Sequence, residues 1–120
     1  MLSLDTQILI DALRGALTPD EEQILSSRSW SISSIVLWEL AKLGQLGRIE
    51  MDIRAPEFAR AMGRIHVWPL DLTVCRQTLA LDFRSDPADE IIAATSIVHN
   101  APLVTRDKRI LASLMVPFPG

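Results

Sequence analysis

The chain alternates short apolar segments with longer amphipathic ones, and this alternation limits the possible folds more than any other feature of the sequence. Strands are expected at residues 1–4, 30–33, 65–69 and 103–105, with a possible edge strand at 114–116. Helices are expected at residues 7–14, 19–27, 34–43, 56–63, 73–83, 87–99 and 108–111. Because parallel strands need crossover connections, usually helices, we predict one α/β domain over residues 1–120. Its mainly parallel sheet should be flanked by helices on both faces, as three layers α/β/α.

Several of the expected helices begin with recognisable capping residues. Thr18, Pro19 and Glu21 combine a capping box with a proline at the first helical position. Ser34 and Thr73 are the predicted caps of the helices that they precede. Asp86 is the predicted cap of the longest helix, because a proline and the first-turn acid Asp89 follow it.

Composition indicates an ordinary globular protein that holds no nucleic acid by bulk charge. The chain has 120 residues, enough to bury a core without disulfides, and its net charge of −3 provides no basic face. The hydrophobic content of 48 % suggests an oligomer or a bound partner. The single cysteine, Cys75, excludes an internal disulfide and is expected in the core.

No apolar run is long enough to span a bilayer and no signal-peptide pattern is present, so we expect a cytoplasmic protein without membrane contact.

Four acidic residues follow strand ends or helix starts that a parallel sheet would bring together. Asp5 follows the strand at 1–4, and Asp107 follows the strand at 103–105. Asp89 lies in the first turn of a helix, and Glu39 lies on the helix after the strand at 30–33. Ligands of open α/β sheets bind beyond the carboxyl ends of the strands, so all four carboxylates are predicted at that rim.

Each acid also has a structural explanation. Asp5, Asp89 and Asp107 could serve as helix caps or first-turn acids, and Glu39 could form an ion pair with Lys42. Four carboxylates in one pocket would repel each other strongly, and such an all-oxygen set selects Mg²⁺ or Mn²⁺. Zinc is not expected, since His66 and His99 have no companions at ligand spacing. The glycine-rich loops that bind nucleotides are absent from the sequence.

Four short motifs stand in order along the chain: Leu4, Asp5 and Thr6 with Ile8, Leu9 and Ile10; Ser33, Ser34, Leu37, Trp38, Glu39 and Leu40; Asp86, Pro87, Ala88 and Asp89 with Ile92, Ala93, Ala94 and Thr95; and Leu103, Val104, Thr105, Arg106 and Asp107. Their order and spacing resemble those of PIN-domain proteins, the metal-dependent ribonucleases best known as VapC-type toxins of prokaryotic toxin and antitoxin pairs. Departures are modest: the family often has asparagine at Gln7, and an aromatic and a basic residue at Ala88 and Glu90.

The resemblance implies a PIN-like fold and a function. It implies that Asp5, Glu39, Asp89 and Asp107 hold one or two Mg²⁺ or Mn²⁺ ions and that Thr6 and Thr105 help to shape the catalytic site. Metal-activated water would then attack RNA phosphodiesters in exposed loops or single strands. A homodimer and inhibition by a small antitoxin protein are also implied. The candidate contacts to RNA phosphate are Arg14, Lys42, Arg48, Arg106, Lys108 and Arg109.

Two other classes of function stay open at this point. A noncatalytic PIN-like binding module would retain the fold with weak metal affinity. A phosphatase or DNA nuclease would use the same metal chemistry on another substrate. The sequence identifies neither the RNA that would be cut nor the antitoxin.

Overall fold

The computed structural model describes residues 1–120, and its four strands form one fully parallel sheet in the order β3-β2-β1-β4. The strands are β1 (Leu2–Leu4), β2 (Trp30–Ser33), β3 (His66–Trp68) and β4 (Leu103–Val104). The chain crosses from β1 to β2 to β3 on one side and then returns to the free edge of β1 for β4. The direction of winding therefore reverses between β1 and β4, and such a reversal opens a crevice at the carboxyl ends of the strands.

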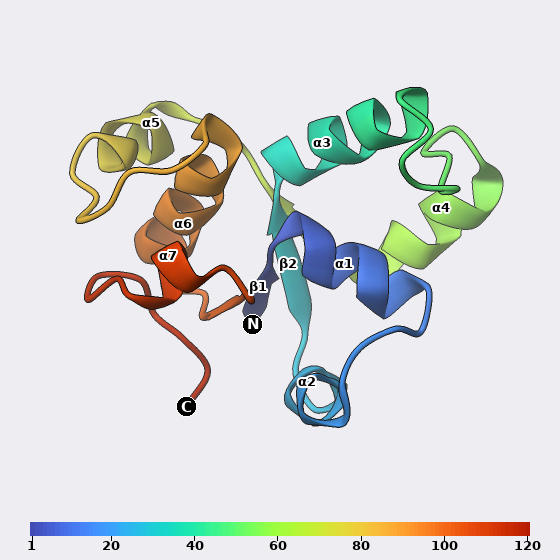
Figure 1. Ribbon diagram of the computed structural model, residues 1–120, viewed down its shortest axis with the longest axis horizontal. Helices are drawn as coiled ribbons and strands as arrows, with labels where there is room; N and C mark the ends of the chain where they lie inside the picture. Colours follow the sequence, from blue (N-terminus) through green and yellow to red (C-terminus); the bar gives the residue numbers. More distant parts are fainter.

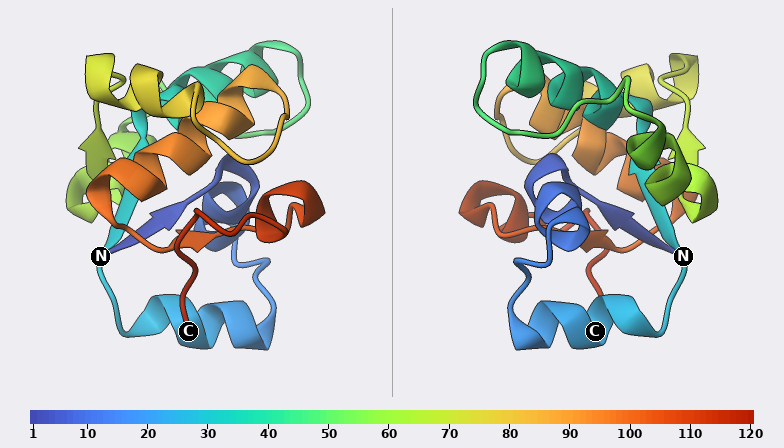
Figure 2. Two further views of the ribbon diagram at one scale, coloured as in Figure 1. Left: turned by 90° about the vertical axis from the view of Figure 1, so that its left-hand side faces the viewer. Right: turned by 90° about the vertical axis from the view of Figure 1, so that its right-hand side faces the viewer.

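Helices cover both faces of the sheet, as predicted. Figure 1 shows α5 and α6 on one side of β1 and β2, and α1 and α4 on the other. Helix α2 stands apart from both layers, below the sheet in Figure 1 and in both views of Figure 2. The helices are α1 (Thr6–Leu13), α2 (Pro19–Ser26), α3 (Ser34–Gln45), α4 (Pro56–Ala61), α5 (Leu72–Thr78), α6 (Pro87–His99) and α7 (Lys108–Leu111), and a 3₁₀ turn covers Met62–Arg64. No helix has both the length and the apolar character that crossing a bilayer requires.

The inner strand β1 is buried on both faces, and this explains its uninterrupted apolar sequence. Leu2 and Leu4 have no exposed surface, and Ser3 between them is also fully buried. A parallel strand with helices over both faces needs no alternation of apolar and polar residues. Register fixes the end of the strand, since Leu4 lies opposite Val104 of β4. The residues that follow, Asp5 and Thr105, therefore leave the sheet side by side.

Two predicted caps are wrong by one or two residues. Helix α3 is capped by Ser33, whose Oγ accepts the Ile35 N–H at 3.3 Å, and not by Ser34. Helix α5 is capped by Asp71, whose Oδ1 accepts the Val74 N–H at 2.9 Å, and not by Thr73. In both cases several polar residues stand together, and the sequence alone does not determine which one takes the extended backbone of a cap.

Three element boundaries also differ from the prediction. Helix α3 continues through Gly44, where a Cβ atom would lie 3.0 Å from the Met51 carbonyl oxygen. This glycine permits a close approach of the following loop instead of ending the helix. Helix α5 stops at Thr78, well before residue 83. The expected strand at 114–116 is absent, because the N–H groups of Met115 and Val116 are bonded to Ser113 Oγ instead of to a neighbouring strand.

Cys75 is exposed, so its predicted place in the core is wrong. Helix α5 is short and has one buried residue, Val74. Cys75 lies about 100° further around the helix, where Leu79 is also 82 % exposed. The apolar side chains of this segment therefore lie largely on the surface of the protein.

Candidate functional site

All four predicted acids line one pocket of about 280 Å³ at the carboxyl end of the sheet. The remaining lining residues come from the start of α1, from α3 and from the segment after β4: Thr6, Gln7, Ile8, Leu43 and Arg106. The pocket lies at the switch point between β1 and β4, where ligand sites of such sheets form. The structure thus brings the acids together, while their role as metal ligands stays a prediction.

Asp5 and Asp107 cap helices and face the pocket at the same time. Asp5 Oδ1 accepts the Ile8 N–H at 2.9 Å at the start of α1. Asp107 Oδ1 accepts the N–H groups of Arg109 at 2.9 Å and Ile110 at 3.1 Å at the start of α7. One oxygen of Asp107 makes both cap contacts, which leaves Oδ2 for a ligand. Capping and ligand binding are therefore compatible, and the caps hold these carboxylates in fixed positions.

Glu39 is half-buried and does not form the alternative ion pair with Lys42. The Thr6 hydroxyl donates a hydrogen bond to Glu39 Oε1, which joins the start of α1 to the middle of α3. Lys42 Nζ instead lies 5.9 Å from the centre of the Trp38 ring and donates to Gln45 Oε1 at 3.1 Å. Thr6 therefore orients the Glu39 carboxylate within the pocket.

Thr105, the second predicted hydroxyl, acts beside the pocket. Its side chain lies near enough to Asp5 to lower the pKa of that carboxyl, and its Oγ1 accepts the Asp107 N–H at 3.1 Å. Thr105 is not among the residues that line the pocket. It connects two of the acids across β1 and β4 instead of facing a ligand directly.

The start of α6 contributes Asp89 to the pocket. Ser85 Oγ donates to Asp89 Oδ2 at 3.2 Å, and the Ser85 N–H donates to Glu90 Oε2 at 3.1 Å. Glu90 is thus held by the turn before α6 and does not line the pocket. Asp86 occupies the predicted N-cap position of α6, but its side chain makes no capping hydrogen bond.

Burial and mutual repulsion raise the pKa of three of these carboxyl groups. Burial is the largest cause for Asp5, Glu39 and Asp89. Asp89 further raises the pKa of Asp5 and of Glu39, and Asp86 raises the pKa of Glu39 and of Asp89. Hydrogen bonds from Thr105, Thr6 and Ser85 oppose these shifts. Asp86 is therefore a fifth acid that acts on the site, which the cap pattern Asp-Pro in the sequence concealed.

The donor chemistry of the pocket fits a hard divalent cation. Carboxylate and hydroxyl oxygens are the ligands that Mg²⁺ and Mn²⁺ prefer. Burial first, and then the neighbouring acids, disfavour the ionised carboxylates, and a bound cation would offset both effects. In the present side-chain positions no three His, Cys, Asp or Glu residues form a group that could hold a metal ion. The structure therefore provides suitable donors around one pocket without a closed ligand set.

Two pocket residues, Gln7 and Arg106, have roles that sequence reasoning missed. Gln7 Nε2 donates to Asp11 Oδ1 at 3.1 Å, from a position on the rim. Arg106 was a predicted phosphate contact, but its Nε, Nη1 and Nη2 atoms all donate to carboxylates of Asp11 and Glu21. Three of the five N–H groups of Arg106 are therefore engaged in ion pairs, and its role as a phosphate contact stays a prediction. Its partners Asp11 and Glu21 lie 95 and 85 residues away in sequence, so no local sequence pattern predicts these contacts.

Comparison with known proteins identifies the family. The PIN domain family model matches residues 2–113. Ribonuclease VapC22 of Mycobacterium tuberculosis strain H37Rv is 32 % identical over 112 residues, which cover 90 % of this chain and 80 % of the relative. The structure of FitAcB from Neisseria gonorrhoeae has a TM-score of 0.63 and 27 % identity, covering 99 % of this chain and 97 % of that one.

Two further solved structures share the fold at lower identity. VapBC2 from Rickettsia felis, bound to a promoter DNA fragment, has a TM-score of 0.74 and 19 % identity over 98 % of this chain and 96 % of that one. A toxin–antitoxin complex from Klebsiella pneumoniae has a TM-score of 0.71 and 21 % identity over 95 % and 92 % of the two chains. With the family model covering nearly the whole sequence, the chain belongs to the PIN domain family.

Proposed function

We propose that this chain is a Mg²⁺- or Mn²⁺-dependent endoribonuclease that acts as the toxin of a prokaryotic toxin–antitoxin pair. The observation that carries the proposal is the shared pocket of Asp5, Glu39, Asp89 and Asp107 at the switch point of the sheet. These four residues would hold the cation. When bound, the cation would neutralise phosphate charge and lower the pKa of a water molecule for attack on the phosphodiester.

The residues of the chain would prepare the site in three ways. Helix caps hold Asp5 and Asp107, and the Thr6 hydroxyl orients Glu39, so hydrogen bonds hold three of the four acids beside the pocket. A cation binds the ionised carboxylates and competes with protons for them. Because the pKa values of Asp5, Glu39 and Asp89 are raised, metal affinity should increase as the pH rises through these pKa values. No histidine lines the pocket, so the chain offers no imidazole as a general base there.

The direct test is cleavage of a total RNA pool by the purified chain with Mn²⁺ and with a chelator. We expect internal cuts in single-stranded or loop RNA with Mn²⁺ and none with chelator, because exposed bases can enter a groove that paired RNA cannot. Matched single-stranded DNA and a phosphomonoester serve as controls. Cleavage that persists in chelator would reject the mechanism. Hydrolysis of either control in preference to RNA would favour the DNA nuclease or the phosphatase.

A small antitoxin protein and a second copy of the chain are the proposed partners. Support comes from the solved relatives, which include a toxin–antitoxin complex, and from apolar side chains left on the surface. Trp38 and Leu46 on or beside α3 are 56 % and 64 % exposed. Such side chains are common in protein interfaces.

Light scattering of the purified chain tests the second copy, and co-purification from the native host tests the antitoxin. We expect a dimer at micromolar concentration and one small companion protein. A monomer throughout that range would remove the dimer, and a chain that emerges alone from its host would count against the antitoxin.

A further inference from the structure

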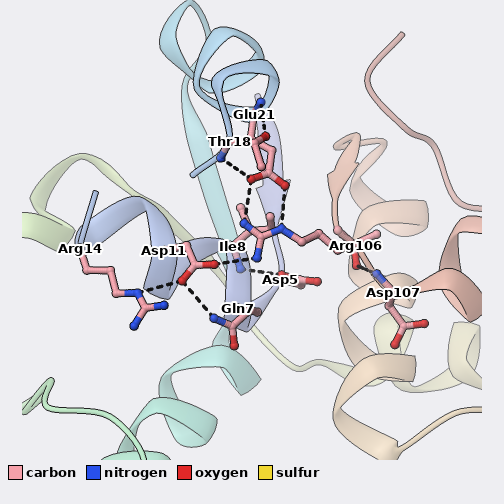
Figure 3. A network of polar contacts seen from close by, with 10 residues as sticks. Asp5, Gln7, Ile8, Asp11, Arg14, Thr18, Glu21, Arg106 and Asp107 are labelled. Carbon is pink, nitrogen blue, oxygen red and sulfur yellow. Dashed lines mark hydrogen bonds and ion pairs between the residues drawn. The ribbon is translucent and has the colours of Figure 1, made fainter. Parts of the chain in front are cut away.

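Arg106 lies between two residues of the proposed site and lines the pocket, yet its guanidinium is bound by two acids that do not line it, Asp11 and Glu21. Figure 3 shows the side chain running from the backbone beside Asp107 toward α1 and α2. Arg106 Nε and Nη2 each lie 2.7 Å from an oxygen of Glu21, and Nη1 lies 2.6 Å from Asp11 Oδ2. This forked geometry is the strongest and most directional form of ion pair in proteins.

Both carboxylates are shielded from water and are themselves held in place. The side chains of Asp11 and Glu21 are 6 % and 14 % exposed. Asp11 Oδ1 also accepts from Arg14 Nε at 3.0 Å and from Gln7, while Glu21 Oε1 accepts the Thr18 N–H at 2.9 Å in the capping box of α2 (Figure 3). The pair with Arg106 lowers the pKa of Glu21 to about 2. Residues of two helices, Asp11 of α1 and Glu21 of α2, therefore hold the Arg106 guanidinium in place.

The segment that carries Arg106 has few other anchors. Strand β4 has two residues and pairs only with β1. Helix α7, which follows directly, has four residues and a single buried one, Ile110. Between these two short elements lie Thr105, whose Oγ1 accepts the Asp107 N–H, and Asp107, which lines the pocket. An anchor at the central residue would limit the movement of both neighbours.

Helix α2 is connected to the body of the protein through the same contact. It buries one side chain, Leu25, whose carbonyl oxygen accepts a hydrogen bond from Trp30 Nε1 at 2.9 Å. Both contacts involve the end of the helix, whereas the Glu21 pair holds its first turn. The position of α2 and the position of the segment at 105–107 are thus coupled by one side chain.

From these contacts we infer that Arg106, clamped by Asp11 and Glu21, is a positioning residue that holds Thr105 and Asp107 in place for the reaction at the pocket. The inference rests on the proposed function for its kinetic consequence, but the clamp itself can be measured without activity. Small displacements of catalytic groups have large kinetic effects, up to about 100-fold for 1 Å. A loosened clamp should therefore lower kcat more than it raises KM.

Glu21→Gln is the informative variant, and Glu22→Gln is its matched control. The glutamine side chain of the first variant retains an oxygen for the capping box but loses the charged fork to Arg106. Glu22 lies in the same turn, is exposed and forms no ion pair, so its substitution removes the same charge from the same helix. Asp11 is less suitable for the test, because its loss would also leave Arg14 without its buried partner.

Two readouts separate the inference from the proposed function. Hydrogen exchange should become faster at the backbone amides of residues 105–107 in Glu21→Gln and stay unchanged in Glu22→Gln. RNA cleavage with Mn²⁺, assayed below the melting temperature of each variant, should show kcat reduced about tenfold with KM within about twofold for Glu21→Gln only. Arg106→Lys, which keeps the charge and loses the fork, should fall between Glu21→Gln and wild type.

Each outcome decides a different claim. Unchanged exchange at residues 105–107 in Glu21→Gln would overturn the clamp whatever the activity. Faster exchange with an unchanged kcat, or a change confined to KM, would overturn the positioning role. Absence of RNA cleavage by the wild type would reject the proposed function. Hydrogen exchange would still show whether the Glu21 ion pair restrains residues 105–107.

Discussion

Asp5→Asn should reduce Mn²⁺-dependent RNA cleavage by about 100-fold or more while leaving the fold intact. Loss of a residue that only supports a metal ligand typically costs 10- to 100-fold, so loss of a direct ligand should cost at least the upper value. Asparagine is as good a helix cap as aspartate, and its Oδ1 can keep the bond from the Ile8 N–H. The variant therefore separates the proposed chemistry of Asp5 from its structural role.

The same substitution should leave the metal-free protein as stable as the wild type or more stable. Burial and Asp89 raise the pKa of Asp5, so the folded state binds a proton at this site more readily than the unfolded state does. The stabilising contribution of that proton is present at low pH and is lost as pH rises through the folded pKa. In its ionised form Asp5 therefore opposes folding, and the neutral amide removes this effect.

Thermal unfolding with and without Mn²⁺ checks both parts. Mn²⁺ should raise the wild-type melting temperature, since a cation at 100 times its Kd stabilises the folded state by about 2.7 kcal/mol. Asp5→Asn should lose most of that shift, whereas Asp20→Asn, at an exposed position in the first turn of α2, should keep it. An Asp5→Asn protein that cleaves RNA at the wild-type rate would remove Asp5 from the ligand set.

The sequence predicted the fold because its local signals agree with the final topology. The apolar run of β1, the capping box of α2 and the long pattern of α6 each specify an element within one or two residues. Once the strands are parallel, their carboxyl ends lie at one edge, so acids that follow β1 and β4 meet there without further information. The grouping of the acids was accessible from pattern for this reason.

Features that depend on three-dimensional packing were not accessible in the same way. The exposure of Cys75 depends on which side of the short helix α5 faces α6, and an error of one residue reverses the answer. The clamp on Arg106 joins residues far apart in sequence, and each of them taken alone resembles an ordinary surface charge. The separation of the carboxylates depends on side-chain rotamers, so pattern places the donors without fixing their geometry.

Leu4→Ala should cause the largest loss of stability of any substitution next to the site. Leu4 has no exposed surface and lies in the inner strand, paired with Val104 and followed directly by Asp5. Truncation of a buried leucine typically costs about 2–5 kcal/mol, because apolar contacts are lost and the surrounding core collapses only partly into the cavity. For a domain of this size that corresponds to a fall in melting temperature of roughly 10 °C or more.

Leu114→Ala is the control, since Leu114 is 97 % exposed and its truncation should change stability by less than about 0.5 kcal/mol. Urea unfolding of both variants gives the two free energies. A cost below about 1 kcal/mol for Leu4→Ala would mean that β1 is not packed between two helical layers as described. Cleavage assayed where the variant stays folded should fall far less than in Asp5→Asn, because the aliphatic side chain of Leu4 supports the strand, whereas the carboxylate of Asp5 carries the proposed chemistry.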